Sequence, residues 1–346
     1  MNRINNHWWQ LFLAMTLFFL AGCATAEETA VPVTDDHDQE HEAEADMLTL
    51  PELTAVPLDG APLKVVATTS IIGDVVAQVG GEVIDLTTLM GPGQDPHSFE
   101  PSARELTAVA DADVIFVNGW GLEETLVTDL AEIAADVPLV PISANIEPLA
   151  FGETDYEEES DDHAHGSADP HVWFSVANVQ QWVENVQTVF SELDPTNIAT
   201  YESNAAAYLT ELADLDTYAK TQLAQIPTEK RFLVTNHDSF GYFAEAYDFT
   251  VLGTVIPGSS TLAEPSASDL TALVATMAEH NLCTLFTEAT VSDNLAKTAA
   301  GELTNCDEVQ VLPLYTGAIG PSSSGADSFV GMFRANVDAI VEGLNG

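Results

Sequence analysis

Residues 64–89 read KVVATTSIIGDVVAQVGGEVIDLTTL, in which two runs of branched apolar residues enclose an amphipathic stretch. The runs at 64–68 and 83–89 favour β-strands, and the apolar spacing from 71 to 79 favours a helix that ends at Gly80-Gly81. Parallel neighbouring strands need a crossover connection, which is usually a helix, and a strand-helix-strand order is typical of them. The stretch therefore predicts a β-α-β unit, and with it an α/β fold.

The same alternation continues to the end of the chain, and Ser102 with Glu105 forms a capping box that opens one of the helices. Parallel strands need helices on both faces of their sheet. We therefore predict two lobes, each a mostly parallel sheet flanked by helices, at 61–175 and 196–346, with a long linking helix at 176–195. The further strands are expected at 113–117, 139–142, 232–235, 250–256, 282–287 and 309–314, and the further helices at 123–134, 198–225, 266–280, 292–303 and 328–344, with one more element at 240–247. The linking helix itself is expected to be regular over 177–193.

The amino terminus has the features of an export signal. Residues 1–22 contain one basic residue, Arg3, followed by an apolar run at 11–20 that is too short to span a bilayer as a retained helix. Leu20-Ala21-Gly22-Cys23 resembles the lipobox of bacterial lipoproteins, which predicts lipidation of Cys23. The protein is then expected on the outer face of the cytoplasmic membrane, in the periplasm or at the cell surface. A plain secretory signal with a fortuitous cysteine is the alternative.

Two acidic segments lack the branched and aromatic residues that build a core. Residues 23–60 are expected to form a disordered tether behind the lipid anchor. The segment 152–168 is expected to be a loop, and its part from Asp155 to His165 carries two histidines. That part either holds a second, weaker metal or is merely solvated, and we expect it to be dispensable for a tight site.

The chain is strongly acidic, with 55 Asp and Glu against 8 Lys and Arg and a formal net charge of −47. Nucleic acids and acidic membrane surfaces are poor partners for such a charge. The same field attracts cations, although solubility or a saline habitat would explain it equally well. Composition therefore excludes nucleic-acid binding without assigning a function.

Three histidines have the context of metal ligands. His97 and His171 each end a copy of the tripeptide Asp-Pro-His, and His237 follows the apolar run Phe232-Leu233-Val234. Proline fixes its own φ and disfavours helix in the residue before it, so each histidine behind an Asp-Pro pair lies on a stiff, non-helical segment. Because loops that follow strands of parallel sheets face a common cleft, the three side chains are predicted to converge there.

Two cysteines remain if Cys23 carries lipid. Cys283 lies beside the predicted strand 282–287, and Cys306 lies just before the strand 309–314. An even pair in an exported protein predicts a disulfide, and adjacent parallel strands would bring the two starts together. Two buried free thiols are the alternative.

Four motifs together carry a family resemblance. They are residues 93–102 (GQDPHSFEPS), 169–174 (DPHVWF), 236–243 (NHDSFGYF) and 332–336 (MFRAN). In this order and spacing they resemble the substrate-binding lipoproteins of bacterial zinc and manganese ABC importers, over about residues 63–344.

The resemblance implies a two-lobed, monomeric binding protein, with a rigid helix between the lobes, that delivers a metal to a permease and its ATPase. It implies His97 and His171 as ligands from the first lobe and His237 from the second. Manganese-binding members typically have a carboxylate at the third position, so His237 favours Zn²⁺ over Mn²⁺, while copper stays open. The family's fourth ligand, an aspartate, aligns with Gly317, which leaves water or Glu288 as candidates, with a supporting or structural role preferred for Glu288. Asp238 is a candidate partner for a ligand's second ring nitrogen, with a plain surface acid as the alternative.

Two other functions use the same motifs. A zinc hydrolase also has three histidines and an open fourth position, but no general base is evident beside them. A surface adhesin that contains a metal would carry every motif. We therefore expect a transport protein that is not an enzyme. The motifs alone do not distinguish it from an adhesin.

Overall fold

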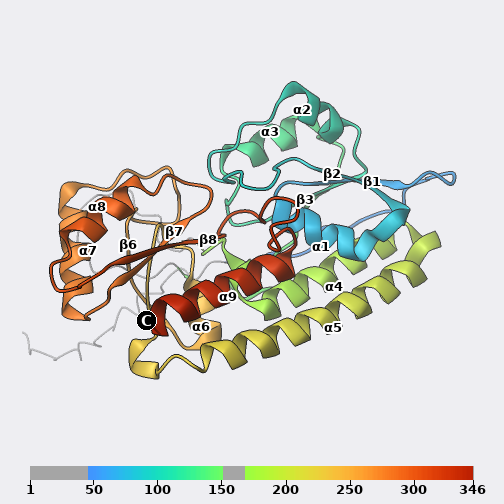
Figure 1. The fold of residues 1–346 in the computed structure, drawn as a ribbon. Coiled ribbons are helices and arrows are strands. Elements are labelled where there is room, and N and C mark those ends of the chain that lie inside the picture. Colours follow the sequence, from blue (N-terminus) through green and yellow to red (C-terminus); the bar gives the residue numbers. More distant parts are fainter. Residues whose placement is uncertain (1–45, 151–167, 346) are drawn as a thin grey trace, which may run out of the picture. The chain divides into compact units, whose positions relative to one another are not determined.

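A computed structural model describes residues 46–150 and 168–345 (Figure 1). The described strands are β1 (Leu63–Ala67), β2 (Ile84–Thr88), β3 (Val114–Val117), β4 (Leu139–Pro141), β5 (Phe232–Thr235), β6 (Thr250–Thr254), β7 (Thr284–Glu288) and β8 (Gln310–Leu314). The described α-helices are α1 (Ser70–Gly80), α2 (Ala103–Ala110), α3 (Thr125–Ile133), α4 (Val176–Leu193), α5 (Ile198–Leu223), α6 (Gly241–Tyr247), α7 (Ala267–Glu279), α8 (Asn294–Glu302) and α9 (Phe329–Asn345). Short 3-10 turns are η1 (Gly81–Val83), η2 (Val172–Phe174), η3 (Pro195–Asn197) and η4 (Thr228–Lys230).

The first lobe contains a four-stranded parallel sheet in the order β2-β1-β3-β4. Side chains of β1 alternate between its faces: Val65 and Ala67 belong to the large core cluster with α1, while Val66 packs with Val109 of α2 and Leu130 of α3. Both faces of the sheet are therefore covered by helices, which confirms the prediction from the β-α-β stretch. The capping box of Ser102 and Glu105 is also present at the start of α2.

The second lobe contains two parallel strand pairs, β5 with β6 and β7 with β8, and β5 lies beside β7. Leu233, Val234, Leu285 and Phe286 are buried on these strands. The α/β fold with parallel sheets and flanking helices is thus confirmed in both halves of the chain.

Two long helices follow the first lobe. The predicted linking helix corresponds to α4, which ends where Asp194 precedes Pro195 and accepts a hydrogen bond from Thr196 N (3.2 Å). The next helix, α5, packs against α4, against α1 of the first lobe and against α9 at the end of the chain (Figure 1). The boundary of the lobes at 176–195 stays a prediction.

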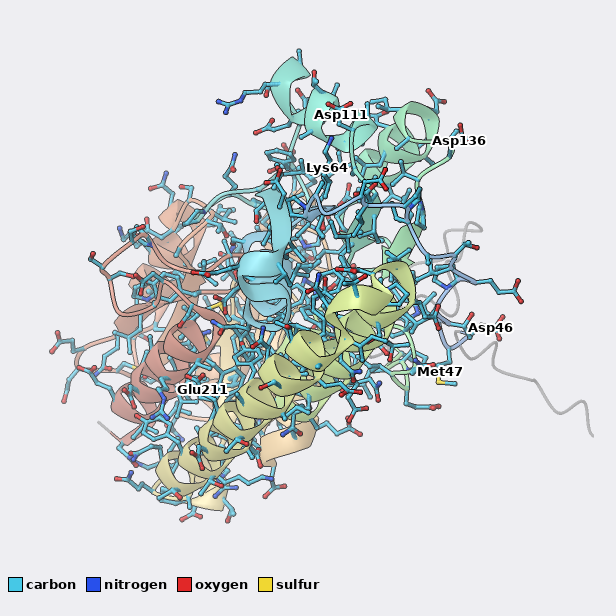
Figure 2. All side chains as sticks on the ribbon, turned by 90° about the vertical axis from the view of Figure 1, so that its right-hand side faces the viewer. Asp46, Met47, Lys64, Asp111, Asp136 and Glu211 are labelled. Carbon is cyan, nitrogen blue, oxygen red and sulfur yellow. A yellow bond between two sulfur atoms is a disulfide. The ribbon has the colours of Figure 1, made fainter. Side chains whose placement is uncertain are left out.

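The structure differs from the predicted tether over residues 46–60. Leu50, Leu53 and Val56 pack against the core, and Val56 N donates to Leu193 O at 2.8 Å. Figure 2 shows Asp46 and Met47 where the described chain begins. This segment has too few apolar residues to form a core of its own. Its widely spaced apolar side chains can still pack against the surface of a domain that has already folded.

The predicted signal at 1–22, Cys23, the rest of the tether and the segment from Asp155 to His165 lie outside the described residues. Within 46–150 and 168–345, no helix combines the length and the apolar character that crossing a bilayer requires.

Candidate metal centre

The three predicted histidines meet in the interior of the protein. His97 lies in the loop after β2, His171 directly precedes η2, and His237 follows β5. Their side chains form a group of possible metal ligands, with exposed fractions of 7%, 1% and 2%. His171 Nε2 lies 3.3 Å from His97 Nε2 and 3.1 Å from His237 Nε2. Loops from both halves of the chain therefore deliver one cluster, as predicted.

Each Asp-Pro-His motif holds its histidine by the same local hydrogen bond. His97 N donates to Asp95 Oδ1 at 3.1 Å, and His171 N donates to Asp169 Oδ1 at 2.9 Å. An aspartate that accepts from the backbone two residues ahead forms a compact turn. Together with the fixed φ of proline, this turn determines where the histidine side chain begins.

Every histidine of the cluster has a carboxylate at its other ring nitrogen. His171 Nδ1 lies 2.8 Å from Asp169 Oδ1, His237 Nδ1 contacts Glu288 Oε1, and His97 Nδ1 lies 3.5 Å from Glu124 Oε1. A carboxylate at Nδ1 accepts the proton of that nitrogen, and a neutral imidazole held in this way has its lone pair on Nε2. The three Nε2 atoms face one another, so a bound cation would take the place of any proton between them.

Glu288 is fully engaged by its neighbours. Besides its contact with His237, its Oε2 accepts from Thr316 Oγ1 at 2.8 Å. Of the roles considered for Glu288, the structure therefore shows the supporting one, beside a histidine of the cluster, and the partner of His237 Nδ1 is Glu288 and not Asp238. The sequence indicated a supporting role for Glu288 but not which histidine it contacts, because 51 residues separate Glu288 from His237.

Gly317 lies against the first Asp-Pro-His motif. A Cβ added to Gly317 would come within 2.6 Å of Pro96 Cδ, which is closer than side-chain atoms approach without movement. An aspartate at this position would therefore require the proline, and the ligand behind it, to shift. Among the described residues, His97, His171 and His237 form the group of possible ligands.

Burial lowers the pKa values of the three imidazoles, whereas neighbouring carboxylates raise them. Burial, together with the two other imidazoles, lowers the pKa of His97 to about 4, and burial lowers the pKa of His171 well below its usual range. Burial also acts on His237, but the Glu288 carboxylate outweighs it and raises the pKa of that imidazole. His97 and His171 are therefore neutral at pH 7, which is the form of imidazole that coordinates a metal.

The two cysteines at the starts of β7 and β8 are bonded in the structure, with an S–S distance of 1.99 Å and a Cα–Cα distance of 5.8 Å. Gln310 N donates to Cys283 O at 2.8 Å beside the bridge. The disulfide thus joins the beginning of β7, the strand that ends in Glu288, to the segment before β8.

We expect the disulfide between Cys283 and Cys306 to form in the exported protein. It should stabilise the fold by about 3 kcal/mol, because it joins two residues that are 23 positions apart and so restricts the unfolded chain. Intact-mass measurement after alkylation, with and without reductant, checks the bond, and chemical unfolding of both forms checks its contribution. Alkylation of two thiols without reductant would contradict it.

The comparisons with known proteins all lead to metal-binding proteins of bacterial transport systems. The family model for the periplasmic zinc-uptake complex component A (ZnuA) matches residues 65–343. The manganese-binding lipoprotein MntA of Halalkalibacterium halodurans is 35% identical over 295 residues, which cover 85% of this chain and 92% of that protein. MntA of Bacillus subtilis is 32% identical over 290 residues, covering 82% and 90%.

Solved structures show the same fold. The periplasmic zinc-binding protein TroA of Treponema pallidum superposes with a TM-score of 0.72 at 31% identity, covering 82% of this chain and 99% of that one. The manganese-bound periplasmic metal-binding protein of Candidatus Liberibacter asiaticus gives a TM-score of 0.70 at 27% identity, covering 81% and 98%. From its motifs, fold and matched length, this chain belongs to the zinc-uptake complex component A family, whose members are metal-binding components of ABC importers and not enzymes.

Proposed function

We propose that this protein captures Zn²⁺ outside the cytoplasm through His97, His171 and His237 and delivers it to the permease and ATPase of an ABC importer. One observation carries the proposal: three buried Nε2 atoms converge, and each imidazole has a carboxylate at its Nδ1. Imidazoles oriented in this way are the common protein ligands of zinc.

The spacing of the nitrogens suits zinc. In a tetrahedral site with bonds of 2.0–2.1 Å, ligand atoms lie about 3.3–3.4 Å apart. The two measured separations, 3.3 Å and 3.1 Å, are close to that value. Only a small movement of the rings is then needed to hold the ion.

A water molecule is our candidate for the fourth ligand. Glu288 already has a partner for each of its oxygens, and Pro96 occupies the space into which a side chain at 317 would extend. A three-histidine site with an open position gives the cargo a place at which its coordination can change during transfer.

Manganese is the second candidate, because the relatives from Halalkalibacterium and Bacillus are named as manganese-binding. Manganese prefers oxygen ligands, whereas the described cluster offers nitrogen. A site made of imidazoles binds zinc more tightly than manganese in the general order of divalent metals. The donor set therefore favours zinc for this chain, in spite of those names.

The acidic surface and the lipobox fit this proposal. The net charge of −47 concentrates cations near the protein, and lipidation of Cys23 would keep it close to the permease. Relatives named as lipoproteins support an anchored, extracytoplasmic location.

Metal competition tests the proposed function directly. We expect metal-free protein to bind one Zn²⁺ per chain and to hold it at least about a hundredfold more tightly than Mn²⁺, because three imidazoles are softer donors than oxygen. Titration with each metal against a chelator of known affinity gives both constants. Equal or tighter binding of Mn²⁺ would contradict the choice of zinc, and binding of neither would contradict the function.

A further inference from the structure

A short loop of the second lobe reaches across to the residues that hold His97. This clasp loop comprises residues 257–262 between β6 and α7. Thr261 Oγ1 donates to Asp95 Oδ2 at 2.6 Å, and Ser260 Oγ donates to Glu124 Oε1 at 2.7 Å. Consecutive hydroxyls of one loop thus each bind a carboxylate of the first lobe.

The two carboxylates are the ones that position His97. Asp95 accepts from the backbone of His97 through its other oxygen, and Glu124 Oε1 lies 3.5 Å from His97 Nδ1. Ser260 and His97 therefore share one oxygen of Glu124. A displacement of the clasp loop would remove a partner from both residues that orient this ligand.

The base of the clasp loop is bonded to the segment that carries His237. Ile256 N donates to Asn236 O at 2.7 Å on one side of that histidine, and Asp238 N donates to Gly258 O at 3.0 Å on the other. The loop consequently connects the segment of His237 with the partners of His97. The segments that carry His97 and His237 are therefore connected in two ways: through the contacts of the imidazoles with His171, and through the clasp loop.

The backbone that presents Glu124 is strained. Glu124 has φ 41° and ψ −112°, and Trp120 in the same turn has φ 48°, both unfavourable for residues with a side chain. Neighbouring Glu123 anchors the turn, since its Oε1 accepts from Thr68 Oγ1 and from Asn118 N. This strained turn aims one carboxylate at both His97 and Ser260.

We infer that Ser260 and Thr261 are positioning residues that fasten the two lobes over the metal and limit how fast it leaves. This inference rests on the proposed function, because it concerns release from the same site. A metal held by ligands of both lobes leaves when the lobes separate, and separation must break both hydroxyl contacts. Their loss should accelerate dissociation and leave association nearly unchanged.

The test uses small substitutions at the two hydroxyls; Ser260 Oγ also accepts from Leu262 N at 3.2 Å, so the Thr261 variants are the cleaner pair. Thr261→Val keeps the shape of the side chain without its hydroxyl, and Thr261→Ser keeps the hydroxyl without the methyl group. Ser260→Ala removes the hydroxyl that contacts Glu124. Zn²⁺ is loaded, and its release into excess chelator is followed by stopped flow. We expect Thr261→Val and Ser260→Ala each to release the metal about tenfold faster, as loss of a hydrogen bond to a charged group implies, and Thr261→Ser to stay within about twofold of wild type.

Ser98 provides a matched comparison, because its Oγ donates to the same Asp95 Oδ2 at 2.9 Å but from the same lobe. If the bridge between lobes matters, Ser98→Ala accelerates release much less than Thr261→Val. An equal acceleration would show that the hydroxyls act only by placing Asp95 and would overturn the inference. Thr271→Val, which alters a hydroxyl bonded within α7, controls for the loss of a surface hydroxyl.

The outcomes separate this inference from the proposed function. If wild-type protein holds Mn²⁺ instead of Zn²⁺, release of Mn²⁺ is measured with the same variants, and the clasp is judged on those rates. Wild-type protein that binds a metal and a Thr261→Val variant that releases it at the same rate would overturn the clasp alone. Binding of neither metal would overturn both.

Discussion

Replacing His171 by alanine is expected to remove tight zinc binding. This imidazole is the central one of the cluster, with its Nε2 within 3.3 Å of both other Nε2 atoms. Zinc sites of this kind are worth roughly 10–16 kcal/mol, so the loss of one of three protein ligands should cost about 3–5 kcal/mol, a factor of about a hundred to several thousand in the dissociation constant. Calorimetry, with competition by a chelator, measures the change.

The variant should still fold, because Asp169 need not remain as an unpaired buried charge. Burial raises the pKa of Asp169 to about 7, so its carboxyl group can take up a proton when the imidazole is absent. His280→Ala serves as the control, since His280 is exposed at the end of α7. Unchanged zinc affinity in a folded His171→Ala protein would contradict the assigned ligands.

Replacing His237 by glutamate is expected to shift the metal preference toward manganese, because a hard oxygen takes the place of a nitrogen. The zinc affinity should fall by at least about tenfold while the manganese affinity is kept or rises. Parallel titrations with Zn²⁺ and Mn²⁺ give the ratio of the two constants. The same ratio before and after the substitution would show that selectivity is determined elsewhere.

Glu288 has to be considered in this experiment, because it contacts His237 Nδ1 and would face a second carboxylate in the variant. We therefore pair His237→Glu with Glu288→Gln, whose amide can donate to the new carboxylate. Glu288→Gln alone is the control: it keeps three imidazoles, so it should weaken zinc about 10–100-fold without reversing the preference. A reversal in this control would assign selectivity to Glu288.

The sequence predicted most of the fold, because apolar periodicity and turn residues act locally. The predicted helix at 71–79 and strand at 83–89 correspond to α1 and β2, and Gly80-Gly81 lies at the end of the helix as expected. The error at residues 46–60 has a different origin. Whether a short apolar segment stays free or packs depends on the surface beside it, which composition does not describe.

The sequence by itself identified the three histidines that the structure brings together, because each lies in a motif whose local chemistry can be recognised: an Asp-Pro pair, or the end of a buried strand. Only the tertiary structure decided their partners. Glu288, Glu124 and the clasp loop come from strands and turns far along the chain, and they meet the histidines because parallel sheets collect the ends of distant strands at one edge. These contacts depend on which strands lie together within each lobe and, for the clasp loop, on how the two lobes pack, and no local pattern of residues encodes either.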